Sequence, residues 1–158
     1  MLDVGPVCSD TINFVIDRVR RVSVCDLFGR LKRAIDQAAF VSSLGGALDY
    51  PAGSFDSIHL WDLVDRLEDE PAAQTVQHLR RLLKPQGALL LIAGGERSDD
   101  AVYAFAVKEN LEVAPRPQPH LLLPYHHRCN RDIMKLLEPL APAESFVYRS
   151  GMREFRFR

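Results

Sequence analysis

The first 28 residues constrain the fold of this chain more than any other stretch, because they combine a strand, a turn, a helix and a second strand. Residues 2–5 form a short apolar strand with a turn at Gly5, and residues 12–19 carry an apolar stripe at helical spacing. A β-branched strand follows and stops at Asp26. In an open α/β sheet, this order places turn amides and an acid at one edge, where a nucleoside can bind.

Composition limits the classes of protein that this chain can belong to. With 158 residues, 47% of them hydrophobic, the chain is long enough for one globular domain with a buried core. The formal net charge of −1 provides no overall positive field to attract nucleic acid. The C-terminal arginines are interleaved with aromatic residues, as on a strand pair with one solvent-exposed face and one face in the core. We therefore expect a single domain over residues 1–158 that binds neither nucleic acid nor a membrane.

Cysteine usage and the absence of targeting signals indicate the compartment. The three cysteines are widely separated and odd in number, which argues against a disulfide framework and suits a reducing cytosol. No leading basic segment and no apolar run of membrane-spanning length is found in the sequence. We expect a cytoplasmic protein.

Strands and helices alternate along the first two thirds of the chain. The spacing of apolar residues predicts a helix over residues 31–38, and acids with a proline at residues 69–71 predict the start of another. Apolar runs predict the strands between them. These strands are expected at residues 40–44, ending at Gly45 and Gly46, at residues 55–61 and at residues 88–93.

The last third of the chain predicts a different closing motif. Ser98 is a candidate cap for a helix over residues 101–109, and the proline-rich residues 114–124 predict a long loop. A helix capped by Asn130 follows. Two final strands are separated only by Ser150 and Gly151, so they must be antiparallel. The sequence thus predicts a doubly wound, mostly parallel seven-stranded α/β sheet of Rossmann-like type with a C-terminal antiparallel hairpin.

Several strings in this order resemble the successive signatures of class I S-adenosylmethionine-dependent methyltransferases. They are LDVG at residues 2–5, Asp26 at the end of the second strand, GSFDSIHLWDLVDRL at residues 53–67 and LRRLLKPQGALLLI at residues 79–92. The last two are the most specific, and the resemblance covers essentially the whole chain. It is similar to a bacterial branch that is described only as methyltransferase-like.

The resemblance implies a site for S-adenosylmethionine at one edge of the sheet. Asp3 and Gly5 would shape the turn under the methionine part of the cofactor. Asp26 would accept both ribose hydroxyls with its two carboxylate oxygens, and Leu27 would lie against the adenine. The other implied residues are Gly45 and Gly46 at the adenine edge, and Leu60, Trp61 and Asp62 facing the sulfonium and its methyl group.

The chain departs from the family pattern at the glycine motif and elsewhere. Gly5, Val7 and Ser9 stand where the family turn usually has three glycines, so the motif is degenerate. A β-branched residue removes the close backbone approach and the positive φ that glycine allows. Gly46 replaces the acid that often follows the third strand, and the family's N-terminal helices, which commonly cover the substrate, are not in this chain.

No catalytic side chain or metal site follows from the pattern. Methyl transfer depends on in-line geometry more than on an acid or base, so the catalytic residues stay unknown. Asp62 could orient the methionine amine, act as a base or cap a helix. His126 and His127 invite a metal, but adjacent histidines in a strand-like segment point to opposite sides, and no second ligand cluster accompanies them. We predict no metal.

The sequence favours two functional interpretations over a dinucleotide-binding one. A dinucleotide site needs G-x-G-x-x-G, and Val7 and Asp10 occupy its second and third glycine positions. The first hypothesis is an S-adenosylmethionine-binding methyltransferase-like protein that acts on a small molecule or a partner-presented substrate, with residues 115–127 as a lid. The alternative is a non-catalytic interaction module that has lost or weakened the cofactor site. A protein partner or a homodimer stays open in both cases.

Overall fold

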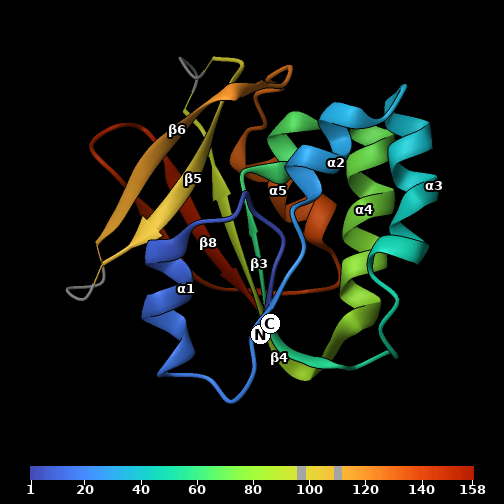
Figure 1. The fold of residues 1–158 in the computed structure, drawn as a ribbon, viewed down its shortest axis with the longest axis vertical. Helices are drawn as coiled ribbons and strands as arrows, with labels where there is room; N and C mark the ends of the chain where they lie inside the picture. Colours follow the sequence, from blue (N-terminus) through green and yellow to red (C-terminus); the bar gives the residue numbers. More distant parts are fainter. Residues whose placement is uncertain (96–98, 109–111) are drawn as a thin grey trace.

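The computed structural model describes residues 1–95, 99–108 and 112–158, and a six-stranded sheet runs through its middle (Figure 1). The sheet order is β2-β1-β3-β4-β8-β7. Its members are β1 (Leu2–Asp3), β2 (Ser23–Val24), β3 (Phe55–Trp61), β4 (Leu83–Ala93), β7 (Pro142–Val147) and β8 (Arg153–Phe157). The first four strands are parallel, whereas β8 is antiparallel to β4 and β7 is antiparallel to β8. The predicted mostly parallel sheet and C-terminal hairpin are confirmed.

Helices flank this sheet on both faces. They are α1 (Ser9–Ile16), α2 (Leu27–Arg33), α3 (Gln37–Ala47), the 3-10 turn η1 (Leu63–Arg66), α4 (Asp69–Leu82) and α5 (Asn130–Leu137). In Figure 1, α3 and α4 lie side by side on one side of the sheet, and α1 lies on the other. The chain is therefore doubly wound, as the alternation of strands and helices predicts.

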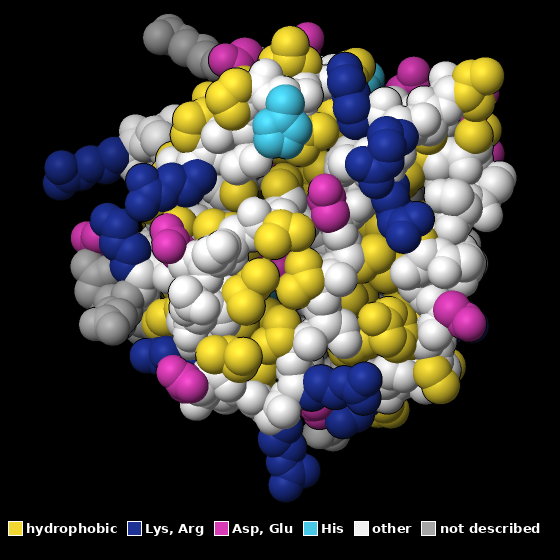
Figure 2. Space-filling model, in the orientation of Figure 1, with side chains coloured by type: hydrophobic (Ala, Val, Ile, Leu, Met, Phe, Trp, Pro, Cys, Tyr) yellow, Lys and Arg dark blue, Asp and Glu magenta, His cyan; other side chains and the backbone are white. Residues whose placement is uncertain are grey.

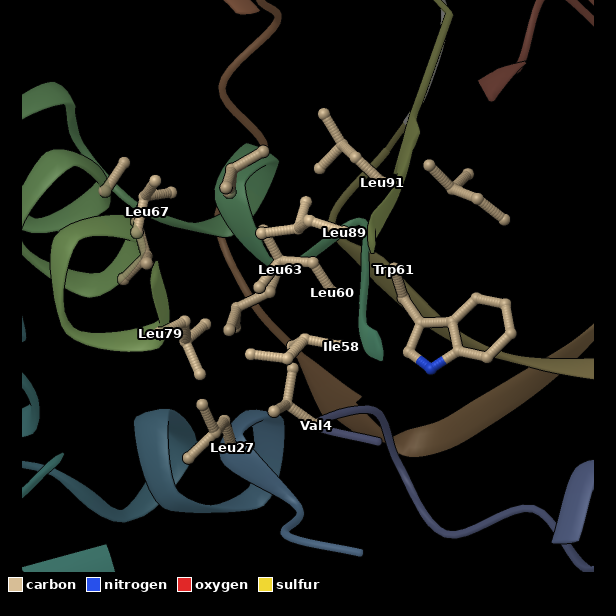
Figure 3. Close-up of a cluster of buried hydrophobic side chains, with 14 of the residues drawn as sticks. Val4, Leu27, Ile58, Leu60, Trp61, Leu63, Leu67, Leu79, Leu89 and Leu91 are labelled. Carbon is tan, nitrogen blue, oxygen red and sulfur yellow. The ribbon is translucent and has the colours of Figure 1, made fainter. Parts of the chain in front are cut away.

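The core lies where β3 and β4 meet α4. Ile58 and Leu60 on β3, Leu89 on β4 and Leu79 on α4 are all fully buried, and Figure 3 shows them in one cluster. Each such side chain contributes roughly 1.5–3 kcal/mol on burial. Because β3 and β4 are paired over most of their length and packed against α4, their carboxyl ends are held in fixed positions.

The predicted third strand at residues 40–44 is wrong, because these residues form the middle of α3, and the sheet therefore has six strands instead of seven. Asp36 caps the helix by accepting a hydrogen bond from the Ala39 amide at 2.7 Å. Phe40 and Leu44 are buried, and their spacing of four residues places them on one helix face. A short apolar run fits either state, and here the cap and the packing of α3 against α4 decide for the helix.

The predicted helix over residues 101–109 and the predicted loop after it are also wrong. They form the strands β5 (Ala101–Val107) and β6 (Val113–Leu122), which pair as a separate antiparallel hairpin. Ser98 and Glu109, the expected ends of that helix, lie outside the described residues. Residues 115–127, the expected lid, are likewise mostly strand.

The prolines of β6 are compatible with this pairing. Pro115, Pro117 and Pro119 occupy alternate positions, and successive N–H groups of a strand point to opposite sides. The three prolines therefore remove donors from one side of β6 only, and the other side can bond to β5. The hairpin has two strands, so the proline side can form a free edge.

The surface and the helices carry two further observations. Figure 2 shows one face on which hydrophobic side chains gather near the centre, with both signs of charge around them. Within the described ranges, none of the helices has the length and apolar character needed to cross a membrane.

Candidate functional site

The turn after β1 is built around the buried carboxylate of Asp3. Its Oδ1 atom accepts hydrogen bonds from the Gly5 amide and from Nε1 of Trp61, both at 2.8 Å. Burial raises the pKa of Asp3 above its usual value, and these two hydrogen bonds oppose the shift. Asp3 thus holds the turn through the protein's own donors.

The indole of Trp61 fills the space beside Gly5. A Cβ atom placed on Gly5 would lie only 2.4 Å from Cδ1 of Trp61. Trp61 ends β3 with a φ of 52°, a left-handed conformation that is rare for a bulky residue. Figure 3 shows its ring pointing away from the leucine cluster, with the ring nitrogen toward the turn after β1.

The hairpin β5–β6 covers one face of the indole. Phe105 on β5 stacks on Trp61, with ring centroids 5.4 Å apart and planes 14° apart. Thr11 in the first turn of α1 donates its hydroxyl to the Phe105 carbonyl and accepts from the Val107 amide. The start of α1 is therefore bonded to the hairpin.

Asp26 lies beside the end of β1 and acts as a helix cap. The amides of its neighbours Cys25 and Leu27 donate to the carbonyls of Asp3 and Val4 at 2.8 and 3.1 Å. Its Oδ1 atom accepts from the Gly29 amide at 2.8 Å, so one of the two oxygens expected for a ribose already stabilises α2. Leu27 itself is fully buried in the core.

The structure does not bring all of the predicted site residues together. Gly45 and Gly46 are exposed in α3, and a Cβ on either would meet nothing within 4 Å. Leu60 is buried in the leucine cluster (Figure 3). Asp3, Gly5, Asp26, Trp61 and Asp62 lie at or next to the carboxyl ends of the parallel strands, whereas the neighbouring Leu27 and Leu60 are fully buried in the core.

Sequence reasoning missed a buried ionic cluster directly after β3. Arg66 donates to Oδ2 of Asp62 at 2.7 Å and to the carbonyls of Asp99 and Ala101 at 2.9 Å. Burial raises the pKa of Asp62, and the guanidinium of Arg66 opposes that shift. The signal that could have found this cluster is the string DLVDRL, in which charged residues interrupt an apolar run beyond a buried strand.

Asp65 is the second buried acid of the cluster. Its Oδ2 atom accepts from the Gly94 amide at 2.8 Å, and its Oδ1 atom has no hydrogen-bond partner among the described residues. Burial raises the pKa of Asp65 to about 7, with the nearby Asp62 carboxylate adding to the shift. This carboxyl therefore ties η1 to the end of β4.

A cavity of about 310 Å³ lies next to this cluster. Its walls come from the ends of β3 and β4, the hairpin β5–β6 and the turn before β8. The residues are Asp62, Arg66, Gly94, Gly95, Asp99, Tyr103, Phe105, Pro115, Ser150 and Met152. Phe105 thus separates the cavity from the stacked indole of Trp61.

The histidines near the end of the hairpin do not form a metal centre with other described residues. His126 donates its amide to the Asp65 carbonyl at 2.7 Å, and Nδ1 of His127 lies 3.5 Å from the Tyr125 hydroxyl. Within residues 1–95, 99–108 and 112–158, no three His, Cys, Asp or Glu side chains are grouped closely enough to hold a metal ion.

Solved structures define the class of this fold. No protein-family model and no curated protein matches the sequence. The 1,6-didemethyltoxoflavin N1-methyltransferase of Burkholderia thailandensis matches with a TM-score of 0.59 at 14% identity, over 99% of this chain and 69% of that one. An S-adenosylmethionine-dependent methyltransferase from Clostridium acetobutylicum matches with a TM-score of 0.59 at 9% identity, over 99% and 82%.

A third solved structure supports the same class. An S-adenosylmethionine-dependent methyltransferase from Methanosarcina mazei has a TM-score of 0.50 at 12% identity, over 99% of this chain and 79% of that one. At such low identities these likenesses concern the fold. The chain has the fold of class I S-adenosylmethionine-dependent methyltransferases.

The residues at the edge of the sheet do not fit the methionine end of that cofactor. Trp61 covers Gly5, and Asp3 is occupied by the turn amide and the indole. Val7, at the second glycine position, is 62% exposed, so it does not fill the place itself. The obstruction comes from Trp61 and Phe105.

Proposed function

We propose that this chain is a non-catalytic binding module with a methyltransferase fold, in which its own side chains take the place of the methionine end of S-adenosylmethionine. The observation that carries the proposal is the indole of Trp61, which lies against Gly5 and donates to Asp3 at 2.8 Å. The stacked Phe105 and the bond between Thr11 and β5 support it further.

The energetic argument is that a cofactor would first have to displace the indole. A buried hydrogen bond to a carboxylate contributes about 1.5–3 kcal/mol and an aromatic stack about 0.5–1.5 kcal/mol. If roughly 2–4 kcal/mol is lost on opening, the apparent affinity falls by a factor of about 30 to 1,000. A ligand that would otherwise bind with a dissociation constant of about 1 μM would then bind with one of about 30 μM to 1 mM.

A methyltransferase remains the second candidate, and a specific observation favours it. The Gly5 turn and Asp26 lie next to each other at the ends of β1 and β2. The similar enzyme from Burkholderia thailandensis was solved with S-adenosylhomocysteine bound. Under this alternative, the hairpin would move aside, and the chain would methylate a small molecule or a partner-presented substrate.

Calorimetric titration with S-adenosylhomocysteine separates the two candidates. We expect the wild type to bind the ligand about 30 to 1,000 times more weakly than Trp61→Ala, because that variant clears the space beside Gly5. Tyr50→Ala is the matched control, since Tyr50 contacts Phe55 at the opposite ends of the strands. Micromolar binding by the wild type that disappears in Asp26→Ala would refute the proposal.

A further inference from the structure

The cavity beside Arg66 has one apolar wall and one polar wall. Tyr103 and Phe105 from β5, Pro115 from β6 and Met152 form the apolar wall. Its volume of about 310 Å³ lies at the lower end of the range of small-molecule pockets. The flat aromatic rings on the hairpin favour a flat ligand of modest size.

The polar wall contains a buried guanidinium and a buried carboxylate, together with the Ser150 hydroxyl. Arg66 is buried, and its guanidinium nitrogens donate to Asp62 and to backbone carbonyls of residues 99, 101 and 123. Asp62 is 4% exposed, and its Oδ1 atom has no hydrogen-bond partner among the residues that the structure describes. Asp99 also lines the cavity, and its Oδ1 atom accepts from the Ala101 amide at 3.0 Å.

An unpartnered buried carboxylate oxygen is costly, and a ligand that donates to it removes that cost. Since the guanidinium of Arg66 already has its partners, it offers an anionic ligand no free strong donor. A ligand with N–H groups and positive charge has the complementary chemistry.

We propose that this cavity binds a small flat ligand with an aromatic body and a cationic N–H donor group, such as an amidinium, which donates to Asp62. The ring of the ligand lies against the apolar wall of the hairpin. This inference rests on the proposed function, because it takes the cavity, and not the place beside Gly5, as the binding site of the module.

Three probes of nearly equal shape test the ligand class. Benzamidine carries a cationic donor group, benzamide a neutral one and benzoate an anionic acceptor. In an NMR titration of the full chain, we expect the amide signals of Gly94, Gly95 and Ser150 to shift with benzamidine. Benzamide is expected to bind about tenfold more weakly, and benzoate more weakly still. Binding of benzoate as tight as that of benzamidine would overturn the inference. So would the absence of a shift with benzamidine at about 10 mM, which is on the order of the weakest dissociation constant expected for a ligand of that size.

Two variants locate the site. Ser150→Trp places a large side chain at the cavity wall and should abolish binding, whereas Ser145→Trp, on exposed β7, should leave it unchanged. Asp62→Asn should weaken benzamidine binding about tenfold while benzamide changes by less than about threefold. Because Asp62 pairs with Arg66, this variant can fail to fold, and Ser150→Trp then decides. Full binding by folded Ser150→Trp would overturn the inference.

A failure of this inference can be distinguished from a failure of the proposed function. If the wild type binds S-adenosylhomocysteine in the micromolar range, the proposed function fails whatever benzamidine does. If neither S-adenosylhomocysteine nor benzamidine binds, the blocked cofactor place stands and only the ligand class of the cavity is wrong.

Discussion

The centre of the sheet and the hairpin β5–β6 are held in place by different means. Strands β3 and β4 pair with each other and with a further strand on either side, and fully buried side chains such as Ile58 and Leu89 fix them. The hairpin forms only a two-stranded sheet. Its position depends on a few named contacts, above all those of Thr11, Trp61 and Arg66.

The two kinds of attachment indicate which part of such a fold can change its ligand. The parallel strands fix the framework, whereas the hairpin and Trp61 determine what can reach the carboxyl ends of the strands. We therefore expect a few contacts at the hairpin to decide whether the space beside Gly5 is open to a cofactor or filled by side chains. The following predictions test the two regions in order of expected effect.

The largest effect is expected in the centre of the sheet. Ile58→Ala on β3 should lower the free energy of unfolding by about 2–5 kcal/mol, because it leaves a cavity in the core. Ile35→Ala is the matched control, since Ile35 is 92% exposed, and it should change stability by less than about 0.5 kcal/mol. Urea denaturation measures both variants, and similar losses would contradict the assignment of the core.

A pH dependence is expected where η1 meets β4. The folded-state pKa of Asp65 is raised from 3.8 to about 7, so the stability that it contributes is full below pH 3.8 and is lost as the pH rises through 7. Asp65→Asn cannot ionise. The free energy of unfolding of the variant should therefore rise relative to that of the wild type as the pH rises from 4 to 7, by on the order of a few kcal/mol.

Urea denaturation of the wild type and of Asp65→Asn at each pH measures this difference, and the wild type serves as the control. Both proteins retain His59, whose pKa burial lowers to about 4 and whose own pH dependence cancels in the difference. A difference between variant and wild type that does not change with pH would show that Asp65 titrates normally.

Glycine substitutions test the filled place beside Trp61. Gly5→Ala should destabilise the fold by about 1–3 kcal/mol, because its Cβ would lie 2.4 Å from the indole. Gly46→Ala should instead stabilise by about 0.5–1 kcal/mol, because Gly46 lies in a helix with nothing within 4 Å. Thermal unfolding measures both, and a neutral Gly5→Ala would mean that the indole is not held against the turn.

The most local effect is expected at the bond between α1 and the hairpin. Thr11→Val keeps the shape but removes the hydroxyl that bonds to Phe105 and Val107, at a cost of about 1–3 kcal/mol at this buried position. Thr75→Val is the matched control, because the buried Thr75 hydroxyl has no partner among the described residues. Hydrogen exchange should accelerate at the Val107 amide in Thr11→Val only; an unchanged rate would contradict the contact.

The two regions also differ in how far the sequence predicted them. Strand β3 and helix α4 begin and end close to where the apolar runs and the acids at residues 69–71 indicate. Val102, Phe105 and Ala106 fall at helical spacing, whereas residues 103–107 alternate large and small apolar residues as a strand does, and the pairing with β6 selects the strand.

The candidate site could also be predicted only in part, because part of it depends on contacts between residues far apart in the sequence. Asp26 and Gly5 follow from local turn and strand-end patterns, and both lie at the expected edge. The placement of Trp61 over Gly5 depends on Phe105, 44 positions further along, and no local pattern contains that contact. A tertiary contact thus determines whether the predicted residues are free to bind a ligand.

The most direct measurement uses the fact that Trp61 is the only tryptophan of the chain. Its fluorescence reports on the place beside Gly5 without any label. Titration of the wild type with S-adenosylhomocysteine to about 10 μM should leave the emission spectrum unchanged, because the ligand would first have to displace the indole. A saturable change in emission with a micromolar midpoint, absent in Asp26→Ala, would contradict the account and identify an open cofactor site.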